Sequence, residues 1–269
     1  MTDKYAVIGN PIAHSKSPQI HKMFAEQTGQ DISYEAILAP LDGFAATIER
    51  LHDEGYKGCN VTVPFKFEAL QLSTWLNGRA QVAQAVNTLK FEDSSILGYN
   101  TDGFGLERDI KRNLGVEIEG KRVLLMGAGG AAHGVAQPLF NINANLAVVN
   151  RTVEKARDMT AAFDKQHQAT VYSYEEIAGQ HFDIVINATS SGLSDEMPPL
   201  PPGIFAFGAL AYDMMYGRET PFMKFAREHG AAVVSDGLGM LVEQAAESFW
   251  IWRGVRPDTT PVIAALRNQ

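Results

Sequence analysis

Lys66 is the side chain whose surroundings in the sequence best suit proton chemistry. It follows a strand-like run, residues 57–63, that ends at Pro64. Ligands of open α/β sheets bind where strands end, so this lysine is expected to reach a cleft between two domains. There it could donate a proton to an oxygen that becomes negative during reduction, or accept one in the reverse direction. The alternative is a solvated surface lysine.

Other polar side chains stand at the ends of neighbouring elements. Asn87-Thr88 and residues 100–103 are each, taken alone, ordinary turn signals. The Asn and Asp side chains of these two segments could also hold the hydroxyls of a polyol together. An aspartate close to Lys66 would orient the ammonium group and favour its charged form. Gln244 lies in a long expected helix, where its amide could face either water or a ligand.

Ser15 and Ser17 precede a helix that has Pro18 at its first position. In extended geometry their hydroxyls point to one side and Lys16 points to the other. Two hydroxyls beside a helix N-terminus could hold a carboxylate. The alternative is that Ser17 is an N-cap and Ser15 a loop residue.

Residues 121–132, KRVLLMGAGGAA, predict a dinucleotide site, because a β-like run leads into a glycine-rich turn and then a helix. Gly127 permits the tight turn, and Gly129 lets the backbone approach the phosphates. Ala132 is small enough for the helix to pack on the strand.

The residues after the next strand indicate which dinucleotide is bound. Arg151 stands about 20 residues on, where NAD-binding proteins place an acid for the ribose 2′-hydroxyl. An arginine can instead bind a 2′-phosphate through two parallel hydrogen bonds, helped by Thr152 and Lys155. We therefore expect NADP rather than NAD. The alternative is a strand, turn and helix with a surface arginine.

The composition predicts a cytoplasmic enzyme. Of 269 residues 45% are hydrophobic and 20% charged, and no apolar run is long enough to cross a bilayer. The net charge of −8 argues against nucleic-acid or anionic-membrane partners. The N-terminus lacks the pattern of a secretion signal. The single Cys59 is expected to be a small buried side chain, and neither a disulfide nor a structural metal is expected.

Strand and helix patterns alternate along the chain and predict an α/β fold with helices on the sheet faces. Strands are expected at 5–9, 32–39, 57–63, 146–150, 184–188, 208–213 and 231–235, with a hairpin over 86–99 that turns at 92–94. Helices are expected at 17–29, 41–54, 78–85, 101–114 and 238–252, and the proline-rich segment 197–202 is expected to be a loop.

Motifs spread over nearly the whole chain match one family. They are IGNPIAHSKSPQIH from Ile8, NVTVPFK from Asn60, AVNT from Ala85, NTDG from Asn100, GAGGAA from Gly127, NRT from Asn150, NATSSG from Asn187, YDMMY from Tyr212 and DGLGMLVEQA from Asp236. In these segments the chain resembles the shikimate dehydrogenases, NADP-dependent enzymes that reduce 3-dehydroshikimate to shikimate in aromatic amino-acid and chorismate biosynthesis.

The resemblance implies a role for each matching residue. Lys66 and Asp102 would form the catalytic pair. The substrate site would consist of Ser15, Ser17, Asn60, Thr62, Asn87, Tyr216 and Gln244. NADP would be held by Gly127, Ala128, Gly129, Gly130, Ala131, Asn150, Arg151, Thr152 and Lys155, with Met214 and Gly237 near the nicotinamide.

The implied fold is α/β with two domains separated by a cleft. An N-terminal α/β substrate-binding domain, residues 1–102, would be completed by C-terminal helices in residues 240–269. Residues 103–239 would form a Rossmann-type NADP-binding domain. The expected partner is a small-molecule substrate, and the chain would act as a monomer or a homodimer.

Three alternatives to this function remain at the level of sequence. One is a quinate/shikimate dehydrogenase that uses NAD, and another is a non-catalytic, NADP-responsive binding protein. The third is a different reductase of the same two-domain plan. A methylene-tetrahydrofolate dehydrogenase would need a pterin pocket, and a glutamyl-tRNA reductase would need a reactive cysteine, for which Cys59 is poorly placed.

Overall fold

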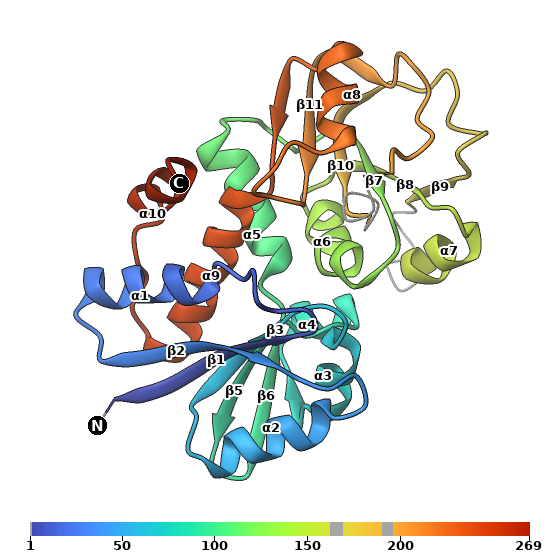
Figure 1. Ribbon diagram of the computed structural model, residues 1–269. Coiled ribbons are helices and arrows are strands. Elements are labelled where there is room, and N and C mark those ends of the chain that lie inside the picture. The colour runs from blue at the N-terminus through green and yellow to red at the C-terminus, as the bar shows by residue number, and fades with distance from the viewer. Residues whose placement is uncertain (1, 162–168, 190–195) are drawn as a thin grey trace. The chain divides into compact units, whose positions relative to one another are not determined.

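The computed structural model describes residues 2–161, 169–189 and 196–269. The chain divides into two compact units, one formed by Met1–Gly105 with Leu241–Gln269 and the other by Leu106–Met240. Each unit is built around a six-stranded sheet with helices packed on it (Figure 1). The two-domain α/β fold that the sequence predicts is confirmed.

The sheet of the first unit is mixed and has the strand order β2-β1-β3-β5-β6-β4. β1 pairs in parallel with β2 and β3, whereas β3–β5 and β5–β6 are antiparallel. The expected hairpin is therefore confirmed. The strand bounds are β1 Asp3–Gly9, β2 Ile32–Leu38, β3 Gly58–Val61, β4 Trp75–Leu76, β5 Thr88–Glu92 and β6 Ser95–Tyr99.

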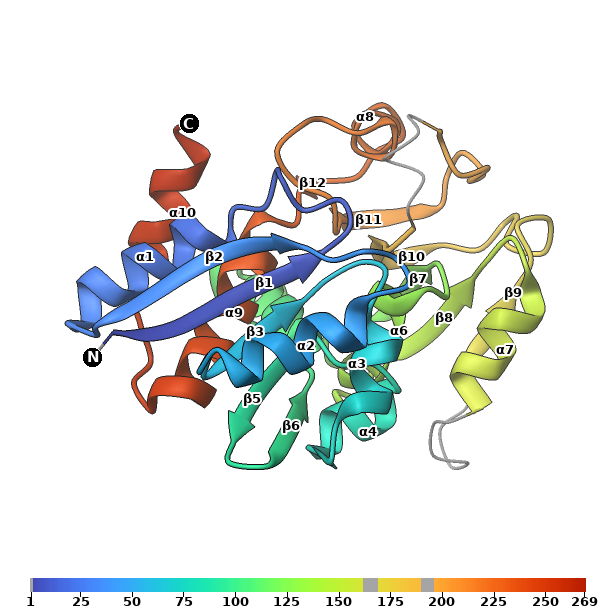
Figure 2. The same cartoon turned by 60° about the horizontal axis from the view of Figure 1, so that its bottom comes forward.

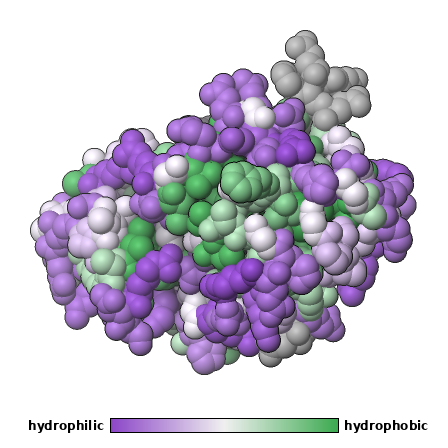
Figure 3. Space-filling view, turned by 90° about the horizontal axis from the view of Figure 1, so that it is seen from above, coloured by the Kyte–Doolittle hydropathy of each residue, from purple (hydrophilic) through white to green (hydrophobic). Residues whose placement is uncertain are grey.

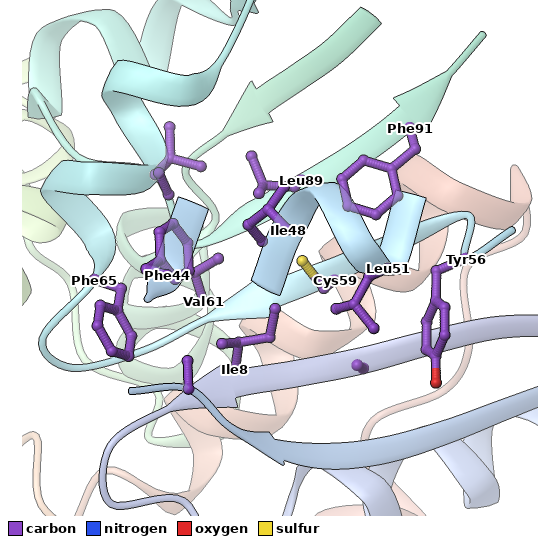
Figure 4. Packing of buried hydrophobic residues seen from close by; sticks show 14 of the residues in the cluster. Ile8, Phe44, Ile48, Leu51, Tyr56, Cys59, Val61, Phe65, Leu89 and Phe91 are labelled. Carbon is purple, nitrogen blue, oxygen red and sulfur yellow. The ribbon is translucent and has the colours of Figure 1, made fainter. Parts of the chain in front are cut away.

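Helices cover both faces of this sheet, as Figures 1 and 2 show. The helices of this unit are α1 Ser17–Thr28, α2 Phe44–Asp53, α3 Lys66–Leu72, α4 Gly78–Ala83 and α10 Thr260–Arg267, together with the part of α9 Leu238–Arg253 that follows Met240. On the face covered by α2 and α3, the α2 side chains Phe44, Ile48 and Leu51 pack against Ile8 and Val61 of the strands (Figure 4).

The other face of the first sheet carries an aromatic cluster. The His21 ring of α1 stacks on Tyr34 of β2, with 4.1 Å between centroids, and lies beside Phe249 and Trp252 of α9. Large flat side chains bury much area in such contacts. The cluster anchors α9 on this sheet.

The second sheet is parallel throughout, in the order β12-β11-β10-β7-β8-β9. This is the strand order of the dinucleotide-binding Rossmann fold. The strand bounds are β7 Arg122–Met126, β8 Asn145–Val149, β9 Thr170–Tyr172, β10 Phe182–Asn187, β11 Phe205–Asp213 and β12 Val233–Ser235.

Helices α6 Gly130–Asn141, α7 Val153–Ala161 and α8 Pro221–Glu228 pack on the second sheet. Phe222, Met223 and Ala226 of α8 belong to the same buried hydrophobic cluster as Leu124 of β7 and Val185 of β10. These central strands have a run of buried residues, which is typical of a parallel sheet covered on both faces.

The helix expected at 101–114 changes its hydrogen-bonding pattern part-way. It begins as α5 Asp102–Arg108 and continues as a π-helical turn, Asp109–Asn113. Asp109 is buried, and its carboxylate accepts hydrogen bonds from Tyr212 Oη at 2.6 Å and from Asn113 Nδ2 at 2.8 Å. The π-helical turn therefore begins at a buried carboxylate that is held by a residue of β11.

Cys59 is fully buried, and burial raises the pKa of its thiol, so the side chain behaves as a small apolar group. Hydrophilic residues are spread widely over the face shown in Figure 3. Among the described residues, none of the helices has the length and apolarity needed to cross a membrane.

Candidate active site

Lys66 and Asp102 form the centre of the candidate site in the first unit. Each is the first residue of a helix, α3 for Lys66 and α5 for Asp102. Lys66 Nζ donates to Asp102 Oδ2 at 2.6 Å, and the two side chains are 13% and 7% exposed. A paired ammonium and carboxylate in a partly buried place can orient a substrate hydroxyl and exchange a proton with it.

Asn87 orients the carboxylate of this pair. Its Nδ2 donates to Asp102 Oδ1 at 2.8 Å, and its Oδ1 accepts from the Thr101 backbone N–H at 2.9 Å. Asn87 is 2% exposed, because it lies just before β5 inside the unit. Each oxygen of the Asp102 carboxylate therefore has its own donor, Lys66 for Oδ2 and Asn87 for Oδ1.

Gln244 of α9 also faces this cluster. Its Oε1 lies 3.3 Å from both Asn87 Nδ2 and Thr101 Oγ1, and its Nε2 donates to the Leu241 carbonyl. The amide thus faces polar groups rather than bulk water.

Asn60, the third residue of β3, extends the network. Its Nδ2 donates to Thr88 Oγ1 at 3.1 Å and Ser248 Oγ at 3.0 Å, while its Oδ1 accepts from Tyr34 Oη at 2.7 Å. Burial raises the pKa of Tyr34 well above its usual value, so the phenol remains a donor. The structure therefore brings Asn60, Asn87, Asp102, Lys66 and Gln244 into one connected polar cluster.

The expected extended geometry of residues 15–17 is wrong. Lys16, the N-cap residue of α1, already has dihedrals in the right-handed helical region, φ −83° and ψ −7°. The Ser17 backbone N–H donates to Ser15 Oγ at 3.3 Å, so Ser15 rather than Ser17 serves as an acceptor at this helix start. Ser17 is buried as the first residue of α1. Thr62 follows β3 and is half-buried.

The sequence assigned no role to four residues of this network: Tyr34, Thr88, Thr101 and Ser248. Thr101 stands in the NTDG motif beside Asp102, and Ser248 is one helical turn after Gln244. That i, i+4 spacing places both side chains on one face of α9 and was the available signal. Tyr34 lies in an edge strand with no local sign of a polar role.

The second unit carries the glycine-rich turn between β7 and α6. Gly127 has φ +110°, where glycine is favoured, and a Cβ there would lie 3.1 Å from the Ala188 carbonyl oxygen. Gly129 is the N-cap of α6, and a Cβ at this residue would meet nothing within 4 Å. An open backbone at a helix N-terminus fits a pyrophosphate. Ala128, Gly130 and Ala131 complete this turn and the first positions of α6, and Ala132 is fully buried.

The residues expected to bind the 2′-phosphate lie at the carboxyl end of β8. Arg151, Thr152 and Lys155 are exposed, the lysine in the first turn of α7. Asn150 Nδ2 donates to the Thr152 carbonyl at 2.8 Å and stabilises the turn between the strand and the helix. Exposed cations on a turn that follows β8, the strand paired with β7, fit a phosphorylated ribose.

Met214 and Tyr216 lie in the segment that follows β11, and both are half-buried. The Gly237 N–H donates to the Met215 carbonyl at 2.8 Å, and a Cβ on Gly237 would lie 2.4 Å from the Met214 carbonyl oxygen. Only a glycine allows this close packing. The NATSSG motif begins at the end of β10, and its residues 190–192 lie outside the described residues.

Comparison with known proteins agrees with this geometry. Family models match the chain over residues 7–89 (shikimate dehydrogenase substrate binding domain), 109–194 (shikimate/quinate 5-dehydrogenase) and 237–267 (shikimate 5′-dehydrogenase C-terminal domain). The NADP(+) shikimate dehydrogenase of Methylobacillus flagellatus is 60% identical over 98% of this chain and 99% of its own length. The chain belongs to the shikimate dehydrogenase family.

Solved structures of similar proteins cover the whole family fold. An Ael1 enzyme from Pseudomonas putida is 47% identical with a TM-score of 0.92 and covers 98% of both chains. The shikimate 5-dehydrogenase of Thermus thermophilus, solved in complex with NADP(H) and shikimate, is 32% identical with a TM-score of 0.89 and covers 99% of both chains. The family assignment, with its two-domain fold, therefore rests on sequence and structure together.

Proposed function

We propose that this chain is an NADP-dependent shikimate dehydrogenase that interconverts 3-dehydroshikimate and shikimate. The observation that carries the proposal is the Lys66–Asp102 pair at 2.6 Å, surrounded by the amides of Asn60, Asn87 and Gln244. This set has a proton donor and acceptor together with hydrogen-bonding groups suited to a ring with several hydroxyls. The full-length similarity to NADP(+) shikimate dehydrogenases supports the same activity.

We assign the proton chemistry to the Lys66–Asp102 pair. In the reductive direction, the Lys66 ammonium lies ready to stabilise the alkoxide that develops on the ring oxygen and to supply its proton. Asp102 holds that ammonium through Oδ2. In the oxidative direction the pair accepts the proton of the same hydroxyl. The nicotinamide, when bound, supplies or accepts the hydride.

We assign the substrate carboxylate to the hydroxyls of Ser15, Ser17, Thr62 and Tyr216. Hydroxyl groups can donate to a carboxylate without adding charge, which suits a chain of net charge −8 that must admit an anion. Asn60, Asn87 and Gln244 are assigned to the ring hydroxyls. Their amides already take part in the network around Asp102 and are held in place by it.

We assign the pyrophosphate to residues 127–131 and the 2′-phosphate to Arg151, Thr152 and Lys155. The turn after β8 contains no carboxylate at 150–152, and an acid there would repel a 2′-phosphate. Met214 and Gly237 are assigned to the nicotinamide. Every assigned residue belongs to one chain, so the proposal is compatible with a monomer or a homodimer.

Initial rates with shikimate and quinate, each with NADP and with NAD, test this proposal. We expect the highest kcat/KM for shikimate with NADP. A preparation of Lys66→Ala made in parallel detects any contaminating dehydrogenase. Preference for quinate with NAD would replace the proposed specificity, and absence of NADP reduction with either acid would favour the non-catalytic, NADP-responsive alternative.

A further inference from the structure

A buried carboxylate outside the proposed catalytic pair closes the base of a loop in the second unit. Residues 214–219 connect the end of β11 at Asp213 to Thr220, the N-cap of α8. Asp213 is 0% exposed, and its Oδ2 accepts from Thr220 Oγ1 at 2.5 Å. The two ends of the loop are therefore joined by one hydrogen bond between side chains.

The same carboxylate also holds the loop backbone. Asp213 Oδ1 accepts from the Met215 N–H at 3.0 Å, and Oδ2 accepts from Asn187 Nδ2 at 3.2 Å. The Met214 N–H donates to the Asn187 carbonyl at 3.0 Å. Thus one buried group connects the end of β10, the first half of the loop and the start of α8.

The charged form of Asp213 suits these contacts, because Thr220, Met215 and Asn187 all present donors to it. Burial raises the pKa of Asp213, and hydrogen bonds from the same three residues oppose that rise. Burying a carboxylate lowers the stability of the fold unless hydrogen bonds compensate for the lost water. The three donors around Asp213 supply that compensation, and the carboxylate in turn holds them in place.

The loop carries Met214 and Tyr216, which the proposed function assigns to the nicotinamide and the substrate carboxylate. Misplacement of a ligand-holding group by about 1 Å can reduce a rate by about 100-fold. The hydrogen bonds from Met215 and Thr220 to Asp213, called the clamp below, hold both ends of this short loop. They limit such misplacement without contacting either ligand.

We propose that Asp213 is a positioning residue that holds the 214–219 loop in its ligand-binding conformation through Met215 and Thr220. This proposal rests on the proposed function, since it concerns how Tyr216 and Met214 are presented. It assigns Asp213 no contact with substrate or cofactor.

Asp213→Asn and Thr220→Val test the clamp. Both side chains keep nearly their original size, but the asparagine cannot accept from all three donors and the valine cannot donate. We expect kcat/KM for shikimate to fall at least about tenfold in each variant. Inhibition by adenosine 2′,5′-bisphosphate, which lacks the nicotinamide, should remain within about twofold of wild type. Thr220→Ser keeps the hydroxyl that Thr220→Val removes, and its kcat/KM should equal that of wild type.

Asp183→Asn is the matched control. Asp183 lies near the start of β10, four positions before Asn187, and its carboxylate accepts from Arg122 at the outer end of the sheet. This control should leave kcat/KM unchanged.

Three results would overturn the clamp. One is wild-type kcat/KM in Asp213→Asn and Thr220→Val. Another is a loss of kcat/KM matched by an equal loss of bisphosphate binding, which indicates partial unfolding. The third is a kcat/KM of Thr220→Ser as low as that of Thr220→Val. This comparison tests the clamp even if Asp213→Asn does not fold. A wild-type chain that does not oxidise shikimate with NADP overturns the proposed function first, and this proposal with it.

Discussion

Lys66 Nζ and Asp102 Oδ2 lie 2.6 Å apart, with side chains only 13% and 7% exposed. Helix starts on either side of the β5–β6 hairpin supply the two residues, so 36 positions of sequence separate them. Solvent screens a pair of this kind less than it screens a surface ion pair. The pair is therefore sensitive to the groups that orient it, and the first prediction concerns one of these.

Replacement of Asn87 by alanine should lower kcat/KM for shikimate by about 10- to 100-fold. The change removes the hydrogen bond to Asp102 Oδ1 and leaves the Thr101 N–H without its acceptor. A hydrogen bond to a charged group contributes about 1.5–3 kcal/mol. Asn77→Ala is the control, because Asn77 caps α4 through the Ala80 N–H and should affect stability rather than turnover. Equal kinetic losses in both variants would argue for a general structural effect.

Replacement of Arg151 by alanine should raise KM for NADP by about 10- to 100-fold and leave KM for NAD nearly unchanged. The arginine is exposed at the carboxyl end of β8 and is assigned to the 2′-phosphate alone. Arg157→Ala removes the same charge from α7, where the Arg157 side chain is 65% exposed and lies beside Glu154. A parallel rise in KM for both nucleotides, or an equal effect of Arg157→Ala, would exclude a specific contact with the 2′-phosphate.

His21→Phe should flatten the pH dependence of stability below neutrality. Burial lowers the pKa of His21 from 6.5 to about 3, so between these values the unfolded chain binds a proton that the folded chain does not. The free energy of unfolding therefore falls as pH falls through this window, by up to about 1.4 kcal/mol per pH unit. Phenylalanine preserves a ring that can stack on Tyr34.

Urea unfolding at pH 7 and pH 5 measures this effect. The loss of unfolding free energy between the two pH values should be about 2 kcal/mol smaller in His21→Phe than in wild type. His14→Phe changes an exposed histidine of the same unit and serves as control. An unaltered pH dependence in His21→Phe would show that His21 does not supply the linkage.

Most of the fold was predictable because its strands are continuous apolar runs and its long helices have a regular apolar face. Helix α3 was missed because Pro64 signals only the end of a strand. In addition, Ala69 is the one fully buried residue within its seven positions, while Phe67 is 44% exposed. The two-residue strand β4 and three-residue strand β9 are too short for a period to be recognised. The π-helical turn begins at Asp109, whose hydrogen-bond partner Tyr212 lies 103 positions away and is therefore absent from any local pattern.

The site was predictable to the extent that strands end with polar residues. Asn60 lies within the strand expected at 57–63, Asn87 at the start of the expected hairpin and Asp102 just after it, and the structure brings them together with Lys66. The hydroxyls of Ser15 and Ser17 were placed in the wrong local geometry, since the helical turn begins one residue earlier than a proline alone indicates. The link from Asn60 to Tyr34 crosses from β3 to the edge strand β2 and required the folded sheet.

Steady-state turnover of Lys66→Ala with shikimate and NADP tests the central assignment most directly. Lys90→Ala, which removes a lysine that pairs with Glu92 at the surface of β5, provides the comparison. We predict that kcat falls at least about 100-fold in Lys66→Ala, with a much smaller change in KM, while Lys90→Ala retains wild-type turnover. Near-normal kcat in a folded Lys66→Ala protein would contradict the assignment of proton chemistry to this pair.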